Sequence, residues 1–299
     1  MKAHIMDLPL FSKWLEDRKF LADSSIHTYT KSLGHFLKDN PDIDKLEPYN
    51  EFLIKMTIKK RTTHHFSVLK AFIEYKIDDA AVKNRLIDGL IRPRFRTDLV
   101  QERAHFSEEE LIRVINNLED EKNQVIATIQ AFTGLRAGDV FRLKRDDIIP
   151  EVYKDNAVLK MVVLGKGKKR NVVYIHNDVI QDLVMNHLIT FKGFDNYAFL
   201  QLGQVGNRTG QMDNEAALIR MNYMQYWKDI KQSLQLCHFD KDSFSTHDFR
   251  RCFARRAWEK WKDIHILQNI LRHADPKVTM RYLDQSGLQN IDYHKEMQG

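Results

Sequence analysis

The sequence predicts a mainly α-helical protein with two domains and a small antiparallel β-sheet in the second domain. The chain has 299 residues, more than a single hydrophobic core usually holds. Apolar residues recur at helical spacing along most of it, and only residues 157–164 and 171–175 have the composition of strands. Glycine and proline are scarce, at 12 and 6 residues, which is typical of an ordered, soluble, helix-rich chain.

Residues 1–90 are expected to form a helical domain. The apolar spacing from residue 8 to residue 88 indicates four or five short helices. Breaks are expected at residues 23–25, 39–41 and 61–63, where serine, threonine and proline can cap or end a helix.

Residues 91–105 are expected to be a basic linker between the domains. Pro93 interrupts the helical pattern there and favours an extended chain. Three arginines flank it and could lie along a DNA backbone: Arg92, Arg94 and Arg96.

The second domain is expected at residues 106–299. Ser107 and Glu110 form a capping-box pattern, which predicts a helix start. Helical spacing continues to about residue 132, and the two predicted strands then follow as a hairpin with a basic turn at 165–170. Further helices are predicted at residues 178–191, 215–236, 246–261 and 264–271.

The charge balance and the lack of long apolar segments bear on the partner and the location of the protein. Lysine and arginine number 47 against 41 acidic residues, a net charge of +6 that favours a polyanionic partner if it gathers on one face. Nothing in the sequence resembles a signal peptide or a membrane span, so we expect a cytoplasmic protein without membrane contact.

The cysteines predict neither a disulfide framework nor a metal site. Cys237 and Cys252 lie far from any CxxC pattern. Together with His238 and His247 they could be assembled into four ligands, but this spacing matches no compact zinc motif. We therefore expect no bound metal and no other cofactor.

Several basic residues and one tyrosine suit chemistry on a phosphodiester. Arg136 and Arg250 can donate paired hydrogen bonds to phosphate oxygens, and Tyr282 can attack phosphorus. His247 shares a helix face with Arg250, as Asp139 does with Arg136 if that segment is helical. Taken singly, the Arg136–Asp139 pair is better explained as a solvent-facing ion pair, and His247 with Arg250 as an ordinary histidine beside a solvated basic face. The basic turn alone is equally compatible with a charged turn that keeps a hairpin soluble.

Four motifs follow one another along the chain: Thr-Gly-Leu-Arg at 133–136 with Asp139, the basic turn at 165–170, His-Asp-Phe-Arg at 247–250, and Leu-Arg-His at 271–273 with Tyr282. In this order they resemble the motifs of the tyrosine recombinases, the phage-integrase or Xer-like site-specific recombinases. Arg272 is a departure, since the family usually has glycine before the histidine. Tyr282 follows His273 by nine residues, the separation associated with the family, and Tyr293 is the nearest rival.

The resemblance implies a role for each residue of the set. Tyr282 would be the nucleophile that forms a 3′-phosphotyrosyl link, and His247 would take its proton. The remaining roles would be charge stabilisation by Arg136 and Arg250, protonation of the leaving 5′-oxygen by Lys166, a hydrogen bond to phosphate from His273, and support from Asp139. No divalent metal or ATP is implied, so activity is expected in EDTA.

The resemblance also implies double-stranded DNA as the partner. Two domains and a basic linker suggest a C-shaped clamp, with residues 1–90 as a helical, SAM-like core-binding domain and a homotetramer acting on two DNA sites. The free protein would be a monomer or dimer, and no accessory protein is identified. Further DNA-binding candidates are Lys168, Lys169, Arg170 and Arg251, besides the linker arginines.

Two other functions are compatible with the same residues. A type IB topoisomerase or a resolving enzyme would cut and reseal one strand without exchanging partners, and relaxation of supercoiled DNA that lacks a target site would indicate it. A non-catalytic DNA-binding protein would bind tightly but form no covalent complex with nicked DNA.

Overall fold

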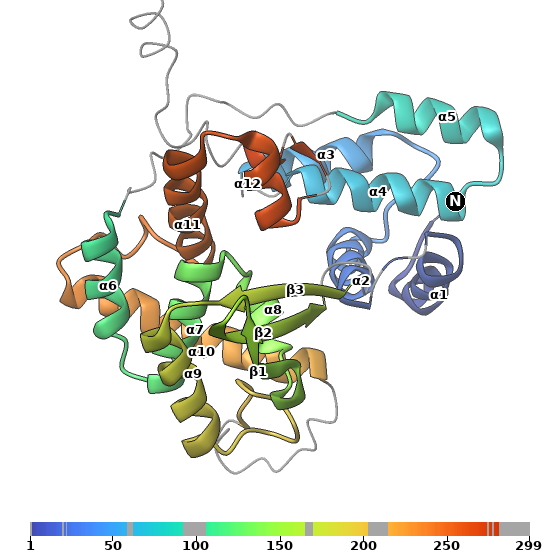
Figure 1. Cartoon of the computed structure of the whole chain (residues 1–299). Helices are drawn as coiled ribbons and strands as arrows, with labels where there is room; N and C mark the ends of the chain where they lie inside the picture. Colours follow the sequence, from blue (N-terminus) through green and yellow to red (C-terminus); the bar gives the residue numbers. More distant parts are fainter. Residues whose placement is uncertain are drawn as a thin grey trace, which may run out of the picture. The chain divides into compact units, whose positions relative to one another are not determined.

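The computed structural model divides into two compact units, Met1–Val100 and Gln101–Gly299 (Figure 1). The described residues are mainly helical and contain one three-stranded antiparallel sheet, which confirms the predicted fold class. Within these residues every helix is too short or too polar to span a bilayer. The structure describes residues 2–19, 21, 23–58, 62–91, 106–164, 170–202, 215–273, 275–276 and 278–280.

The first unit is a helical domain with an aromatic centre. Phe36 stacks on Tyr49 with ring centroids 5.0 Å apart, and Phe72 meets both Phe36 and Phe11 edge-on. These four side chains are almost fully buried, so they anchor the helices to one core. The elements are a 3₁₀ turn at Ile5–Asp7 and helices α1 (Leu8–Lys19), α2 (Asp23–Leu37), α3 (Glu47–Ile58), α4 (Thr62–Lys76) and α5 (Ala80–Gly89).

In the second unit, other helices and the sheet surround a central helix, α7 (Glu121–Thr133). Helix α7 is buried along most of its length and packs against α11 (Thr246–Trp261) (Figure 1). Ser107 and Glu110 form the predicted capping box at the start of the unit. The other helices are α6 (Glu108–Asn116), α8 (Ala137–Phe141), α9 (Asp178–Thr190), α10 (Glu215–Leu236) and α12 (Ile264–Leu271).

The sheet has three strands in the order β1–β2–β3, one more than the sequence predicts. Strands β2 (Asn156–Leu164) and β3 (Arg170–Ile175) form the predicted antiparallel pair. The additional strand is β1 (Ile148–Tyr153), which lies at the edge of the sheet formed by the described residues, and an edge strand tolerates a proline such as Pro150. Its two-residue turn to β2 has positive φ at both positions, Lys154 and Asp155, as in type I′ hairpins.

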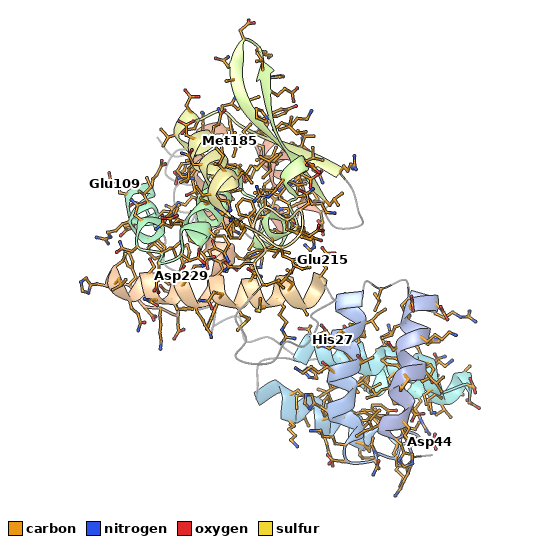
Figure 2. All side chains as sticks on the ribbon, turned by 90° about the horizontal axis from the view of Figure 1, so that it is seen from below. His27, Asp44, Glu109, Met185, Glu215 and Asp229 are labelled. Carbon is orange, nitrogen blue, oxygen red and sulfur yellow. The ribbon has the colours of Figure 1, made fainter. Side chains whose placement is uncertain are left out.

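Helix α10 is fixed to the start of α7 by one buried carboxylate. Asp229, labelled on the long helix in Figure 2, accepts hydrogen bonds from the backbone N–H of Glu119 and the side-chain amide of Asn123, both at 2.8 Å. Asn123 is fully buried, so this contact is shielded from water. Both helices contact the start of α11, because Gln130 of α7 and Tyr223 of α10 form hydrogen bonds with Thr246.

Candidate active site at the start of helix α11

The loop after α7 is shaped by Gly134. This residue ends the helix with φ of 68°, a left-handed conformation that glycine adopts without strain. A Cβ here would lie 2.5 Å from the Phe253 ring, so close packing against α11 also requires glycine. Gly134 therefore allows the loop after α7 to contact α11 closely.

Arg136 and Asp139 lie at the start of α8. Arg136 is the residue that precedes the helix, and its Nη1 lies 3.8 Å from Asp139 Oδ2. The arginine side chain is 38% exposed, whereas the aspartate side chain is 11% exposed. The pair therefore leaves the guanidinium accessible to an anion from solution.

The first turn of α11 is fixed by Asp248. Its Oδ2 accepts hydrogen bonds from the Ser245 backbone N–H at 2.6 Å and the Ser245 hydroxyl at 2.7 Å. His247 lies beside it on the exposed side of the turn. Partial burial lowers the pKa of His247, and the charges of Arg250 and Arg136 lower it further, although Asp248 opposes this shift. His247 is therefore mainly neutral at neutral pH.

Arg250 is fully buried and connects three segments of the chain. Nη1 donates to the carbonyl oxygen of Gly134, and Nη2 donates to that of Leu271. The same Nη2 lies 3.0 Å from Nε2 of His273. The guanidinium thus holds the loop after α7 and the end of α12 against α11.

His273 is a buried, neutral histidine with an assignable tautomer. A guanidinium only donates, so Nε2 of His273 accepts the hydrogen bond from Arg250. Nδ1 then carries the proton and donates to Oγ1 of Thr279 at 2.9 Å. Burial lowers the pKa of His273 to about 4, with further contributions from the charges of Arg250, Arg136 and Arg272.

Gln130, a buried glutamine that was not among the predicted site residues, joins the loop after α7 to the start of α11. Nε2 of Gln130 donates to the carbonyl oxygens of Leu135 and Thr246, both at 3.2 Å. Its Oε1 accepts from the Tyr226 hydroxyl at 2.9 Å. The only sequence signal was an amide inside an otherwise apolar stretch of helix, and such a residue needs internal partners when buried.

Five of the predicted site residues are grouped in the described part of the second unit. Arg136 and Asp139 form one pair, Arg250 and His273 form another, and His247 lies within the electrostatic influence of both arginines. The other predicted catalytic residues, Lys166 and Tyr282, lie outside the described residues, as do the rival Tyr293 and the DNA-binding candidates Lys168, Lys169, Arg92, Arg94 and Arg96.

The two remaining DNA-binding candidates differ in their surroundings. Arg170 is exposed at the start of β3, opposite Leu164 on β2. Arg251 is largely buried and forms an ion pair with Asp248 on the same helix. Arg170 is thus accessible to a polyanion, whereas the ion pair of Arg251 would have to rearrange.

Neither cysteine belongs to a metal site in the described part of the chain. In the described ranges, no three histidine, cysteine or acidic side chains come together in a way that could hold a metal ion. Cys237 is buried, and burial raises the pKa of the Cys252 thiol to about 11. Cys252 therefore remains a protonated thiol at neutral pH.

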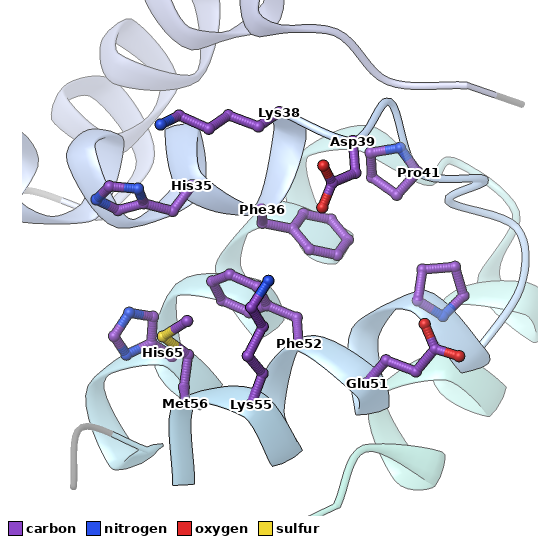
Figure 3. Close-up of a pocket in the computed structure, with 11 residues that line it drawn as sticks. His35, Phe36, Lys38, Asp39, Pro41, Glu51, Phe52, Lys55, Met56 and His65 are labelled. Atoms are coloured by element: carbon purple, nitrogen blue, oxygen red, sulfur yellow. The ribbon is translucent and has the colours of Figure 1, made fainter. Parts of the chain in front are cut away.

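A hollow lies in the first unit, between α2 and α3 (Figure 3). Phe36 and Phe52 meet edge-on in its lining, with ring centroids 5.4 Å apart. Lysine and acidic side chains both line it, so its charge does not favour an anion: they are Lys38, Lys55, Asp39 and Glu51. None of the predicted site residues contributes to this hollow.

The sequence matches a known protein family over most of the second unit. Residues 104–287 match the model of the phage integrase family. The tyrosine recombinase XerD of Rickettsia bellii is 22% identical over 285 residues, covering 91% of this chain and 92% of that protein. The tyrosine recombinase XerH of Campylobacter jejuni is 26% identical over 183 residues, which cover 59% of this chain and 47% of the relative.

Solved structures of similar fold cover nearly the whole chain. A structure of the XerH site-specific recombinase bound to a palindromic difH substrate, in a post-cleavage complex, has a TM-score of 0.66 and 18% identity, covering 99% of this chain and 85% of that one. A lambda integrase dimer bound to a COC′ core site, residues 75–356, has a TM-score of 0.68 and 15% identity, covering 97% and 98%. These similarities concern the fold.

Proposed function

The chain belongs to the phage integrase family and is a site-specific DNA recombinase of the tyrosine type, and we propose that the residues at the start of α11 carry out its chemistry. The observation that carries the proposal is the grouping of Arg136, His247, Arg250 and His273 around one helix start. Nothing in the relatives favours a topoisomerase or a non-catalytic DNA-binding protein.

Tyr282 is the proposed nucleophile. Its oxygen forms a bond to the scissile phosphorus, and the bond from phosphorus to the 5′-oxygen breaks, leaving a 3′-phosphotyrosyl link. A free phenol has a pKa of roughly 10, so the tyrosine needs a proton acceptor near neutral pH. His247 is suited to this because its lowered pKa keeps the ring neutral. Lys166 is proposed to give a proton to the departing 5′-oxygen.

The two arginines are proposed to stabilise the charged phosphorane in different ways. Arg136 is exposed and can donate directly to phosphate oxygens. Arg250 contributes its positive charge from a buried position, because its terminal nitrogens hold the loop after α7 and the end of α12. The positive end of the α11 dipole adds to the same field.

His273 and Asp139 are proposed to position these groups. In the tautomer described above, Nε2 of His273 accepts from Arg250. Donation to the phosphate, which the family resemblance implies, would require this nitrogen to gain a proton and release Arg250. Asp139 restrains Arg136 from the more buried side of their pair. No metal takes part in this scheme, and we expect cleavage to persist in EDTA.

Double-stranded DNA is the proposed partner. Residues 1–90 would be the core-binding domain, 91–105 a basic linker, and 106–299 the catalytic domain, so that both domains contact one duplex. Backbone contacts would come from Arg92, Arg94, Arg96, Lys168, Lys169, Arg170 and Arg251, and the affinity should fall steeply with salt. Strand exchange would require a homotetramer on two DNA sites, assembled from monomers or dimers in the cytoplasm.

The experiment that tests the proposal traps the covalent intermediate. A palindromic site selected from a randomised duplex library is prepared with a nick next to the scissile phosphate. The wild-type protein should form a denaturation-resistant complex with this DNA, both with and without EDTA, and Tyr282→Phe should form none. Tyr293→Phe is the control and should react normally. Tight specific binding without any covalent complex would contradict the proposal.

A further inference from the structure

Arg272 occupies a backbone position that disfavours a side chain. It ends α12 with φ of 55° and ψ of 44°, and its N–H donates to the carbonyl of Asn269. A left-handed conformation costs a residue with a Cβ roughly 1–2 kcal/mol. Glycine would end this helix without that cost. The arginine therefore has no advantage in terms of backbone conformation.

The side chain of Arg272 also carries a cost. Both terminal nitrogens, Nη1 and Nη2, are buried, and neither has a hydrogen-bond partner among the described residues. Burying donors of a charged group without acceptors is unfavourable, because the lost hydration is not replaced. Burial accordingly lowers the pKa of Arg272, and only the charge of Asp139 opposes this shift.

The surroundings of Arg272 belong to the candidate active site. The next residue, His273, accepts from Arg250, and the charge of Arg272 contributes to the low pKa of His273. Asp139 and Arg136 of the α8 start also influence Arg272 electrostatically. The two unpartnered donors thus lie where the proposed chemistry brings a phosphate, which offers strong acceptor oxygens.

We propose that Arg272 is a third arginine of the phosphate site, and that its terminal nitrogens donate to a non-bridging oxygen of the scissile phosphate. This inference rests on the proposed function, because that function supplies the phosphate. The left-handed backbone and the unsatisfied donors of Arg272 are then explained, since a strained residue with unsatisfied donors is stabilised when its ligand binds. A rearrangement in which Arg272 instead pairs with Asp139 is the alternative that the test must exclude.

The test compares two substitutions that make the same backbone change. Arg272→Gly removes the side chain at the end of α12, and Lys262→Gly does so at the end of α11, where Lys262 is exposed with φ of 49°. Formation of the covalent complex on the nicked site and thermal unfolding are measured for both. Arg272→Gly should slow cleavage about 100-fold, the usual effect of losing one donor to a transition-state oxyanion. Its unfolding temperature should stay the same or rise, and Lys262→Gly should cleave at the wild-type rate.

A second substrate separates contact with the phosphate from a structural role. If the scissile phosphate is replaced by a methylphosphonate, one non-bridging oxygen and its charge are removed. The difference in rate between wild type and Arg272→Gly should then shrink at least 10-fold, whereas a structural defect would persist on both substrates. An equal defect on both substrates, or a lower unfolding temperature of Arg272→Gly, would overturn the inference.

The outcome also distinguishes this inference from the proposed function. If wild type forms a covalent complex that depends on Tyr282, and Arg272→Gly forms it equally fast, only the role of Arg272 is wrong. If wild type itself forms no complex on any selected site, the proposed function fails.

Discussion

The two arginines for which the sequence predicts the same role differ in their surroundings. Arg136 is 38% exposed, and its Nη1 lies 3.8 Å from the carboxylate of Asp139, which is a long ion pair. Arg250 is fully buried, and its terminal nitrogens bind two backbone carbonyls and His273. One arginine is therefore accessible to a ligand, and the other holds the site together.

This difference separates what a substitution does to folding from what it does to chemistry. Removing a buried charged group leaves its partners without hydrogen bonds and costs several kcal/mol, whereas an exposed ion pair contributes little. Loss of activity in an Arg250 variant is consequently ambiguous unless stability is measured as well. Loss of activity in an Arg136 variant reports directly on the reaction.

The largest expected effect is that of Arg250→Ala. Two carbonyl oxygens and Nε2 of His273 lose their donor, so we expect a loss of roughly 3–5 kcal/mol in the free energy of unfolding. Urea denaturation followed by circular dichroism measures this, and cleavage should be lost too.

Arg255→Ala is a matched control on the same helix. Arg255 is 40% exposed and pairs with Glu259 on the surface of the helix, so its removal should change the free energy of unfolding by less than about 1 kcal/mol. A wild-type stability for Arg250→Ala would show that its carbonyl contacts do not hold the site together.

Arg136→Ala should abolish the reaction and spare the fold. We expect cleavage of the nicked site to fall at least about 100-fold, because a donor to the phosphorane is lost. The free energy of unfolding should change by less than about 1 kcal/mol, since the ion pair that is removed lies at the surface. A drop in stability comparable to that of Arg250→Ala would remove the distinction between the two arginines.

The sequence predicted the parts of this site that depend on local patterns. The starts of α9, α10, α11 and α12 all lie at the predicted residues, because caps and apolar periodicity are encoded within a few neighbouring positions. Strand β1 was missed, because Pro150 argues against a strand unless the strand lies at the edge of its sheet.

The burial of Arg250 could not be predicted in the same way. Its acceptors lie 116 and 21 residues away in the sequence, and they are backbone carbonyls, which carry no residue-specific signal. The positioning role of Gln130 was hidden for the same reason, because it depends on the carbonyls of Leu135 and Thr246. A motif predicts which side chains lie close together, but not which of them donate their hydrogen bonds to backbone carbonyls.

The pH dependence of stability tests the buried side of the comparison. The pKa of His273 is about 4 in the folded protein, below the value of roughly 6.5 in an unfolded chain. Between these values the unfolded chain binds more protons, so the free energy of unfolding should fall as the pH is lowered from about 6.5 towards 4.

The contribution of His273 is obtained from a difference between two proteins. His247, His64 and His187 also have lowered pKa values and shift stability in the same direction. Urea denaturation of wild type and His273→Gln at about pH 7.5 and about pH 5 therefore isolates one histidine. Wild type should lose more stability than the variant on acidification. Equal losses would contradict a neutral, buried His273.

The smallest expected effect is that of Thr279→Val, which probes the far end of the chain of hydrogen bonds from Arg250. Valine keeps the shape of threonine but cannot accept the hydrogen bond from Nδ1 of His273, so we expect a loss of about 1 kcal/mol in the free energy of unfolding. Thr279→Ser keeps the hydroxyl and serves as the control.

The Nδ1 tautomer also makes a sharper prediction for nitrogen NMR, in which Nδ1 of His273 should show a protonated signal and Nε2 an unprotonated one in the wild-type protein. The reverse assignment would mean that Arg250 does not donate to this histidine, and His273 would then not be held by the guanidinium that binds the carbonyls of Gly134 and Leu271.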